Sequence, residues 1–117
     1  MTMPTKQYDA GFATAEAAVA VPALMAVLAL AIGVVVAVGA QLKCVDAARV
    51  GARAAARGDS DAVVTRAAQS VAPRGARIVI RHRGSRVEVD VTANALVTHL
   101  LPSVHVAAKA VGESEAR

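Results

Sequence analysis

Polar and apolar positions divide the chain into a first part dominated by one long apolar run and a second part of mixed pattern. Residues 17–40 contain no charged and no amide side chain. As a helix with a rise of about 1.5 Å per residue, this run reaches about 36 Å, against a membrane hydrocarbon thickness of about 30 Å. The run is apolar on every side, and the rest of the chain is too short to enclose it. The pattern therefore predicts a transmembrane helix.

Small residues follow this run at helical spacing. Residues 41–57 contain no proline, and Ala47, Gly51 and Ala55 stand four positions apart. A stripe of small side chains lets another helix approach closely, which is a common geometry of packing in membranes. We therefore expect the helix to continue to about residue 57, to end at Gly58, and to use this stripe for helix packing.

An arginine face accompanies the small-residue stripe. Arg49, Arg53 and Arg57 also stand four positions apart, on another side of the same predicted helix. Two interpretations stay open. In the first, the guanidinium groups contact lipid phosphates or acidic residues of neighbouring subunits, as this planar group does readily. In the second, the face is solvated and has no partner.

A second, shorter helix is expected before the pattern changes. It begins after a cap at Asp59 or Ser60 and runs to about Val71, because small apolar residues repeat there at helical spacing. Pro73 and Gly75 close it. Beyond these two residues the chain alternates with a period of two.

The alternating segments predict a β-hairpin. Residues 78–80 and 87–92 flank a turn at residues 83–85. The valines and the acids of the second segment point to opposite faces, with Val87, Val89 and Val91 on one side and Glu88 and Asp90 on the other. Exposed ion pairs with these two acids, each worth well under about 1 kcal/mol, are expected from Arg77, Arg81 and Arg86.

The last part of the chain has two interpretations. Residues 95–111 are either a further strand pair interrupted at residues 102–103, or a loop and one last strand. The predicted fold class is α+β: a long N-terminal transmembrane helix that continues into a juxtamembrane helix, a second short helix, and a small antiparallel β-sheet packed on the helix.

Composition excludes several classes of protein. Hydrophobic residues make up 56% of the 117 residues but aromatic residues only 2%, so a large enzyme core is not expected. The net charge is +4, but the cations are interleaved with acids and no nucleic-acid-binding motif is present, so we expect no nucleic acid as partner. The single cysteine, Cys44, excludes an intramolecular disulfide. It either packs as a small hydrophobic residue or forms an intermolecular disulfide.

Motifs for catalysis or cofactor binding are absent from the sequence. The histidines, His82, His99 and His105, are not accompanied by a zinc motif or a carboxylate cluster. There is no glycine-rich phosphate loop and no oxyanion-hole motif. We therefore expect a protein that is not an enzyme, with no metal and no cofactor.

The apolar run is preceded by a short motif. Gly11 and Phe12 are followed by Glu16, the fifth residue after the glycine. This segment resembles the type IV prepilin signal. The resemblance implies that a prepilin peptidase cuts after Gly11, that Phe12 becomes the new N-terminus, and that the α-amino group of Phe12 pairs with Glu16 when subunits dock. The alternative is that Glu16 only marks the interfacial end of the helix, where the helix dipole favours it.

The resemblance extends along about half of the chain. Pro22 lies inside the apolar run, where we expect a helix kink, and the run is followed by the sequence QLKCVDAARVGAR from residue 41 to residue 53. Residues 9–57 resemble the TadE-like family of minor pilins, or pseudopilins, of Tad (Flp) pilus systems, although Ala17 departs from the aromatic residue common after the glutamate.

The resemblance implies a structural subunit in the assembly of a type IVb-like pilus for adherence or secretion. Its implied partners are the prepilin peptidase, the major Flp-type pilin and other minor pilins, the inner-membrane pilus assembly platform, and membrane lipid. The implied organisation is a leader over residues 1–11, a membrane and juxtamembrane helix over 12–57 with its span at about 17–40, an extracytoplasmic domain over 58–112, and a flexible tail over 113–117.

Two observations favour other readings. Val38, Gly39 and Ala40 are small residues of the kind that signal peptidase needs, so a secreted or simply anchored small domain is the alternative. The apolar run is, however, longer than the apolar core of a signal peptide, which has about 7–15 residues.

The charges on the two sides of the run concern its orientation. Lys6 precedes the run, whereas Lys43 and the three residues of the arginine face follow it. By the positive-inside rule this count places the C-terminal domain in the cytoplasm, whereas the prepilin resemblance implies a single-pass protein with that domain outside.

Overall fold

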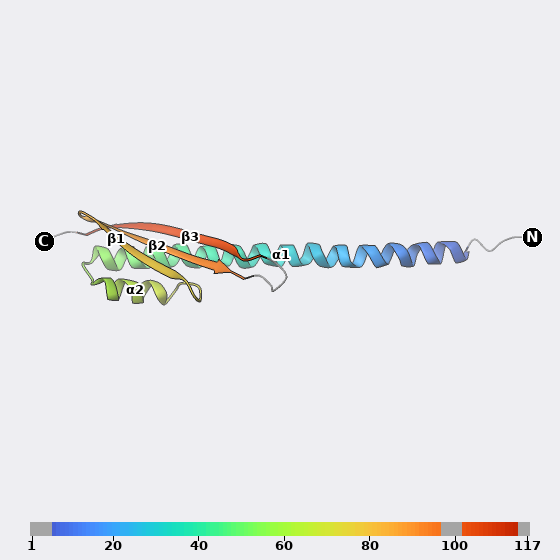
Figure 1. Cartoon of the computed structure of the whole chain (residues 1–117), viewed down its shortest axis with the longest axis horizontal. Helices are drawn as coiled ribbons and strands as arrows, with labels where there is room; N and C mark the ends of the chain where they lie inside the picture. Colours follow the sequence, from blue (N-terminus) through green and yellow to red (C-terminus); the bar gives the residue numbers. More distant parts are fainter. Residues whose placement is uncertain (1–5, 97–101, 115–117) are drawn as a thin grey trace, which may run out of the picture. The chain divides into compact units, whose positions relative to one another are not determined.

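The computed structural model describes residues 6–96 and 102–114. Its elements follow in the order α1 (Lys6–Ala56), α2 (Asp61–Gln69), β1 (Arg77–Arg83), β2 (Arg86–Ala95) and β3 (Val104–Glu113) (Figure 1). This is the α+β class expected from the sequence: one long apolar N-terminal helix, a short second helix and a three-stranded antiparallel sheet. The chain divides into two compact units, Met1–Gly33 and Val34–Arg117.

Helix α1 supplies the whole described part of the first unit. It continues through Pro22 without a break, so the proline does not end the helix. Every residue from 10 to 32 is exposed, including large apolar side chains such as Leu24 and Leu28. In this unit the chain itself therefore leaves the apolar run uncovered on all sides.

Helix α1 ends as the sequence predicts. Gly58 has a φ of 81°, its N–H donates to the carbonyl of Ala55 at 3.0 Å, and the N–H of Asp59 donates to the carbonyl of Ala54 at 3.2 Å. These two bonds form a Schellman motif, which only a residue tolerant of positive φ closes without strain. Ser60 is the N-cap of α2, which ends at Gln69 rather than at about Val71.

The three strands form an antiparallel meander in the order β1-β2-β3. A two-residue turn joins β1 and β2, and Gly84 in it has a φ of 61°, a conformation that favours glycine. Strand β2 extends to Ala95, and the last strand, β3, which both interpretations of the last part of the chain expect, begins at Val104. Residues 97–101 of the proposed strand pair lie outside the described residues.

The sheet also extends further toward the C-terminus than expected. The sequence predicts a flexible tail from residue 113, but β3 includes Glu113, and the N–H of Ser114 donates to the carbonyl of Ser85 at 2.8 Å. Because β2 begins at Arg86, which pairs with Glu113, the strand pairing continues to the turn. The tail boundary is therefore too early.

The core of the second unit lies between the inner face of the sheet and the two helices. Val89 and Val91 in the central strand are fully buried, and Val87 is nearly so. The facing residues of both neighbouring strands are apolar, since Ile80 pairs with Val89 and Ala108 pairs with Val91. The remaining members of the core come from the helices and from the strand ends: Cys44, Ala47, Ala48, Ala54, Ala55, Val64, Ala68, Ala93 and Val106.

Two glycines allow the sheet to lie very close to α1. A Cβ on Gly51 of α1 would lie 2.9 Å from Cγ1 of Val89 in β2. A Cβ on Gly112 of β3 would overlap the backbone carbonyl oxygen of Ala52. A valine methyl can give way by a rotamer change, but the helix backbone cannot, so the contact at Gly112 is the stricter of the two.

We expect Gly112→Ala to lower the free energy of unfolding by about 1–3 kcal/mol, because the added methyl must push β3 away from the backbone of α1. The measurement is thermal unfolding of the full chain in detergent micelles, followed by the circular dichroism of the sheet. The matched control is Gly39→Ala, since a Cβ at Gly39 meets nothing within 4 Å. Equal stability of the two variants would contradict the close contact.

Candidate functional site

The predicted processing residues lie on one exposed stretch of α1. Gly11, Phe12 and Glu16 all lie within the helix, and Phe12 is 78% exposed. A Cβ at Gly11 would meet nothing within 4 Å. Phe12 and Glu16 are four positions apart, so their side chains lie on the same side of the helix. The structure therefore leaves this segment open to a partner.

The peptide bond after Gly11 is helical, whereas a protease binds an extended backbone. Cleavage at this bond would therefore require the first turns of α1 to unwind. Gly11 lowers the free energy needed to unwind this part of the helix, because glycine is about 1 kcal/mol less favourable than alanine within a helix. The position near the start of α1, which begins at Lys6, also helps because helix ends fray readily.

The small-residue stripe has a partner within the chain. Ala47 is fully buried and Ala55 is 5% exposed, and both belong to the core that the sheet and α2 complete. Gly51 faces Val89 and Ala68. The stripe does serve packing, as its spacing predicts, but the element packed on it is the chain's own β-sheet together with α2. The expectation that it packs on another helix in a membrane is therefore too narrow.

The arginine face is exposed along α1. Arg49 and Arg53 are exposed, and Arg57 forms an ion pair with Asp59, with 3.0 Å between Nη2 and Oδ2. This pair is local and joins the end of the helix to the following turn. The exposure of the other two arginines is compatible with both interpretations of this face.

Cys44 is fully buried in the core of the second unit. Burial removes the thiol from water, which raises the pKa of Cys44 because the thiolate form loses its hydration. The position fits the interpretation of Cys44 as a small hydrophobic residue. It opposes an intermolecular disulfide, because the sulfur is not at the surface.

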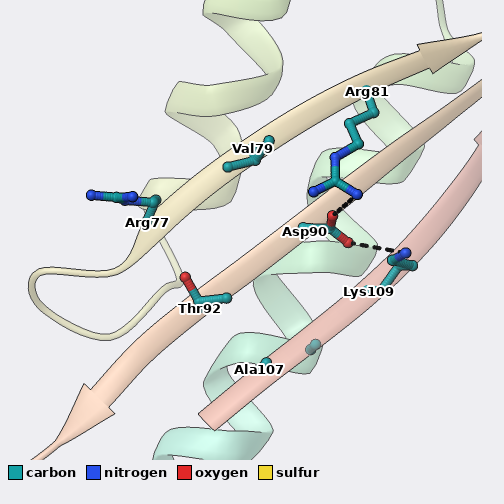
Figure 2. A pocket seen from close by; sticks show the side chains of 8 residues that line it. Arg77, Val79, Arg81, Asp90, Thr92, Ala107 and Lys109 are labelled. Atoms are coloured by element: carbon teal, nitrogen blue, oxygen red, sulfur yellow. Dashed lines mark ion pairs between the residues drawn. The ribbon is translucent and has the colours of Figure 1, made fainter. Parts of the chain in front are cut away.

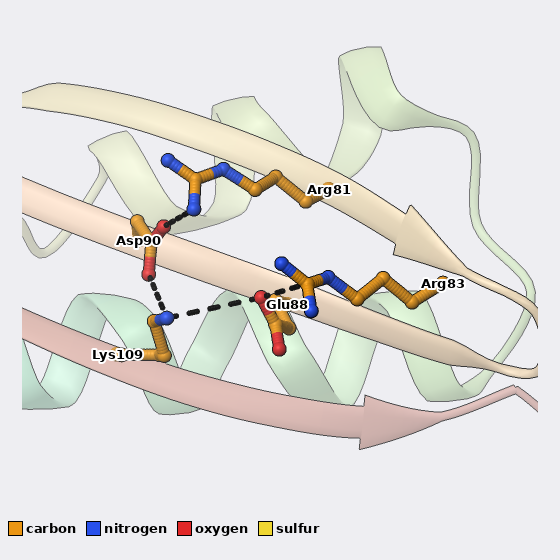
Figure 3. A network of polar contacts seen from close by, with 5 residues as sticks. All are labelled: Arg81, Arg83, Glu88, Asp90 and Lys109. Atoms are coloured by element: carbon orange, nitrogen blue, oxygen red, sulfur yellow. Dashed lines mark ion pairs between the residues drawn. The ribbon is translucent and has the colours of Figure 1, made fainter.

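The outer face of the sheet carries a network of ion pairs (Figure 3). Lys109 in β3 lies between the two acids of β2, at 3.7 Å from Oδ1 of Asp90 and 3.8 Å from Oε2 of Glu88. Arg81 adds a contact of 3.4 Å to Asp90, and Arg83 one of 3.8 Å to Glu88. The cations are more than half exposed, so each pair contributes little to stability by itself.

This network corrects the expected pairing in part. Arg81 does pair with Asp90, but Arg86 pairs with Glu113 at 3.8 Å. The reason is the register, because Arg86 stands directly opposite Glu113 in β3. Lys109 was not identified from the sequence. The alternation of β3 could have revealed it, since Lys109 occupies an outward position between inward alanines.

A shallow hollow lies beside the network, over the outer surface of the strands (Figure 2). Thr92 and Ala107, which pair across β2 and β3, lie in it together with Arg77 and Lys109. An adjoining polar hollow is lined by Arg77, Asn94 and His105, whose Nδ1 lies 3.1 Å from Oδ1 of Asn94.

Another histidine contact joins the sheet to α2. Nε2 of His82 lies 2.8 Å from Oδ1 of Asp61, and both side chains are more than half exposed. Within residues 6–96 and 102–114, no three His, Cys, Asp or Glu residues are grouped so that they could hold a metal ion. His99 lies outside the described residues.

The membrane-length run is the most distinctive candidate in the described chain. A helix from Ala10 to Ala56 has a mean hydropathy of 2.8 over its most apolar window, and only 6% of that window is buried. The helix is thus long and apolar enough to cross a membrane. It also carries all the residues predicted for processing and docking.

Comparisons with known proteins give one informative match. The chain is 43% identical over 100 residues to a protein of Mycobacterium tuberculosis (strain ATCC 25618 / H37Rv) named apoptosis inhibitor Rv3655c. The aligned region covers 86% of this chain and 77% of that protein. No family model matches the chain. No solved structure matches it.

We expect Cys44 to resist alkylation by a maleimide in the folded chain at neutral pH and to react promptly after denaturation. Burial blocks access and the raised pKa keeps the sulfur protonated. Because the folded chain holds this proton at a pH where the unfolded chain has lost it, stability should be full below the ordinary thiol pKa and decline as the pH rises through the folded value.

The control for this measurement is Ser85→Cys in a Cys44→Ala background, which places a thiol in the exposed turn between β1 and β2. This variant should react without denaturation. Equal reactivity of the two thiols in the folded chain, or a disulfide-linked dimer of the natural chain on a non-reducing gel, would contradict the buried position.

Proposed function

The chain belongs to the same family as the M. tuberculosis protein named apoptosis inhibitor Rv3655c, and we propose that it is a TadE-like minor pilin, a structural subunit that takes part in the assembly of a Tad (Flp) pilus. In this proposal it is cut after Gly11 by a prepilin peptidase. It is held in the cell membrane by α1, with the second unit outside the cytoplasm, until it joins other pilin subunits on the assembly platform.

One observation carries the proposal: a prepilin-like cleavage motif stands at the start of an apolar helix that the chain leaves uncovered. Gly11, Phe12 and Glu16 have the required order and spacing. The helix that follows them is exposed from residue 10 to residue 32. An uncovered helix of this kind is suited to two environments in turn, a bilayer before assembly and the helices of neighbouring subunits afterwards.

The carboxylate of Glu16 supports the same proposal. A charged group at the edge of hydrocarbon is costly unless it has a partner. Cleavage after Gly11 creates such a partner, because the free α-amino group of Phe12 is a cation at nearly the same depth. Phe12 and Glu16 stand one helical turn apart, which allows pairing within a chain or between adjacent chains.

The second candidate is a small domain that is anchored by α1 or released after cleavage near Ala40. Val38, Gly39 and Ala40 favour it, since small residues suit signal peptidase. Cleavage near Ala40 would leave the buried residues of α1, from Cys44 onward, in the released domain, so the start of the mature chain distinguishes the two candidates.

The processing prediction is tested in a bacterium that assembles Tad-type pili. We expect the membrane-extracted protein to begin at Phe12 and the Gly11→Ala variant to remain uncut, because a prepilin peptidase requires the glycine. Intact-mass measurement with N-terminal sequencing reads both results. Gly39→Ala is the control, and it should be processed normally.

Other starting points separate the alternatives. A start at Gln41 supports secretion, and an uncut natural chain supports a simple anchor. Normal cleavage of Gly11→Ala would rule out the prepilin mechanism.

The orientation needs a reporter other than Cys44, which is buried. In the Cys44→Ala background, we expect Ser85→Cys to react with a membrane-impermeant maleimide in intact cells, because the proposal places this turn outside. Lysed cells give the full extent of labelling. Labelling only after lysis would place the second unit in the cytoplasm, as the positive-inside count indicates.

A further inference from the structure

The second unit is fastened along α1 at two points that define its position on the helix. Nε2 of Gln41 donates to the carbonyl of Ala107 at 2.8 Å. Gly112 lies directly against the backbone of Ala52. The two contacts are equally far apart on both elements. From Gln41 to Ala52 the helix advances eleven residues, or about 16 Å, and from Ala107 to Gly112 the strand advances five residues, also about 16 Å. Strand β3 therefore runs alongside α1 in the same direction (Figure 1).

This alignment places the beginning of β3 beside the apolar run. Val104 precedes Ala107 by three residues, or about 10 Å of strand, which corresponds to six or seven residues of helix. The beginning of β3 is thus level with Val34 and Val35, within the predicted span at residues 17–40. The contact of Ala40 with the core supports this position.

This end of the unit exposes several large apolar side chains beside the polar hollow of Asn94 and His105. Six large hydrophobic side chains here are between 42% and 72% exposed, and we call them the apolar end: Val34, Val35, Val38, Leu42, Leu96 and Val104. They are distributed around this end: the four on α1 lie away from the covered side that carries Cys44 and Ala47, and Leu96 and Val104 belong to the sheet side.

Charge begins only beyond the apolar end. The described residues from 34 to 42, from 93 to 96 and from 102 to 108 carry no lysine, arginine, aspartate or glutamate. The nearest cations are Lys43 on α1, Arg74 just before β1 and Arg77 on β1, all exposed. Arg77 pairs with Thr92, which pairs with Ala107, so it lies at the level of Gln41. Cations at this level suit lipid phosphates, while their stems cover apolar surface.

We propose that the apolar end is a lipid-contact surface, so that the second unit is partly embedded in the bilayer interface with the beginning of β3 and the end of β2 among the lipids. The occupant is the bilayer itself, because Val34, Val35 and Val38 of the apolar end belong to the same apolar run, residues 17–40, that the proposed anchoring places in the bilayer. The inference rests on the proposed membrane anchoring by α1.

The proposal changes the extent of the membrane span. If the sheet begins beside Val34, only residues 17–33 cross the hydrocarbon without cover from the second unit. Seventeen residues advance about 25 Å, which is at the short end of the usual range for a membrane helix. The last turns of the predicted span then lie in the interface together with β3.

The test uses tryptophan fluorescence, because the natural chain contains no tryptophan. Full-length variants are placed in phosphatidylcholine and phosphatidylglycerol vesicles whose acyl chains are either brominated or not. The test variant is Val104→Trp and its matched control is Val111→Trp, since both valines are exposed residues of β3 and lie seven positions apart. Leu28→Trp reports whether α1 itself enters the bilayer.

We expect Leu28→Trp and Val104→Trp to lose most of their emission in brominated vesicles, and Val111→Trp to keep it. Leu96→Trp should behave as Val104→Trp does, which guards against a local effect of one substitution. Circular dichroism of each variant in the unbrominated vesicles establishes that the sheet is retained.

Three results would overturn the inference. Quenching of Leu28→Trp but not of Val104→Trp or Leu96→Trp would leave the anchor intact and place the second unit clear of the lipid. Blue-shifted but unquenched emission at position 104 would indicate contact with a second copy of the chain. Absence of quenching at all positions would overturn the membrane anchoring as well.

Discussion

The second unit depends on how closely a β-sheet can approach a helix when no aromatic ring fills the space between them. The core consists of alanine, valine and one cysteine. Side chains this small exclude water only if the two backbones nearly touch, since interiors are packed without voids. Gly112 against Ala52 and Gly51 against Val89 provide that approach. A larger residue at Gly112 would separate the layers, because it would meet the backbone of α1.

The same constraint divides α1 into two parts with different surfaces. Where the sheet covers it, the helix presents small residues such as Ala47 and Gly51. In the first unit, large residues such as Leu24 and Leu28 are exposed. A large residue in the covered part would prevent the contact with the sheet, and the large residues of the first unit provide the apolar area that the proposed membrane anchoring needs. The composition of the chain, rich in both classes, follows from this division.

The sheet was predictable where its pattern is simple. In β2, valines alternate with polar residues, and this pattern gave the buried face correctly. Strand β3 was harder to delimit because four of its ten residues are alanine or glycine, and neither residue favours a strand by itself. The close contact of Gly112 could not be predicted, because its partner, Ala52, lies sixty residues earlier in the chain.

The candidate site was predictable in a different way. The spacing of Ala47, Gly51 and Ala55 indicates that another element packs closely on this side of α1, but it does not indicate whether that element is a helix or a sheet. The partner is decided by contacts distant in sequence. Gly11, Phe12 and Glu16 were identified through a resemblance, and the structure adds that their stretch of helix is exposed. The ion pairs of Arg86 and Lys109 depend on the register of β3, which local sequence does not reveal.

The folded unit also changes how the charges after the apolar run should be weighed. The positive-inside rule concerns short loops near the ends of a span, and long segments cross the membrane largely regardless of their charge. Arg49, Arg53 and Arg57 belong to the part of α1 that lies in the second compact unit, and Arg57 is paired with Asp59. Lys43 lies next to the apolar end, where lipid phosphates are available on either side of a membrane. The four cations are therefore compatible with both orientations, and the proposed orientation rests on the resemblance of Gly11, Phe12 and Glu16 to a prepilin signal.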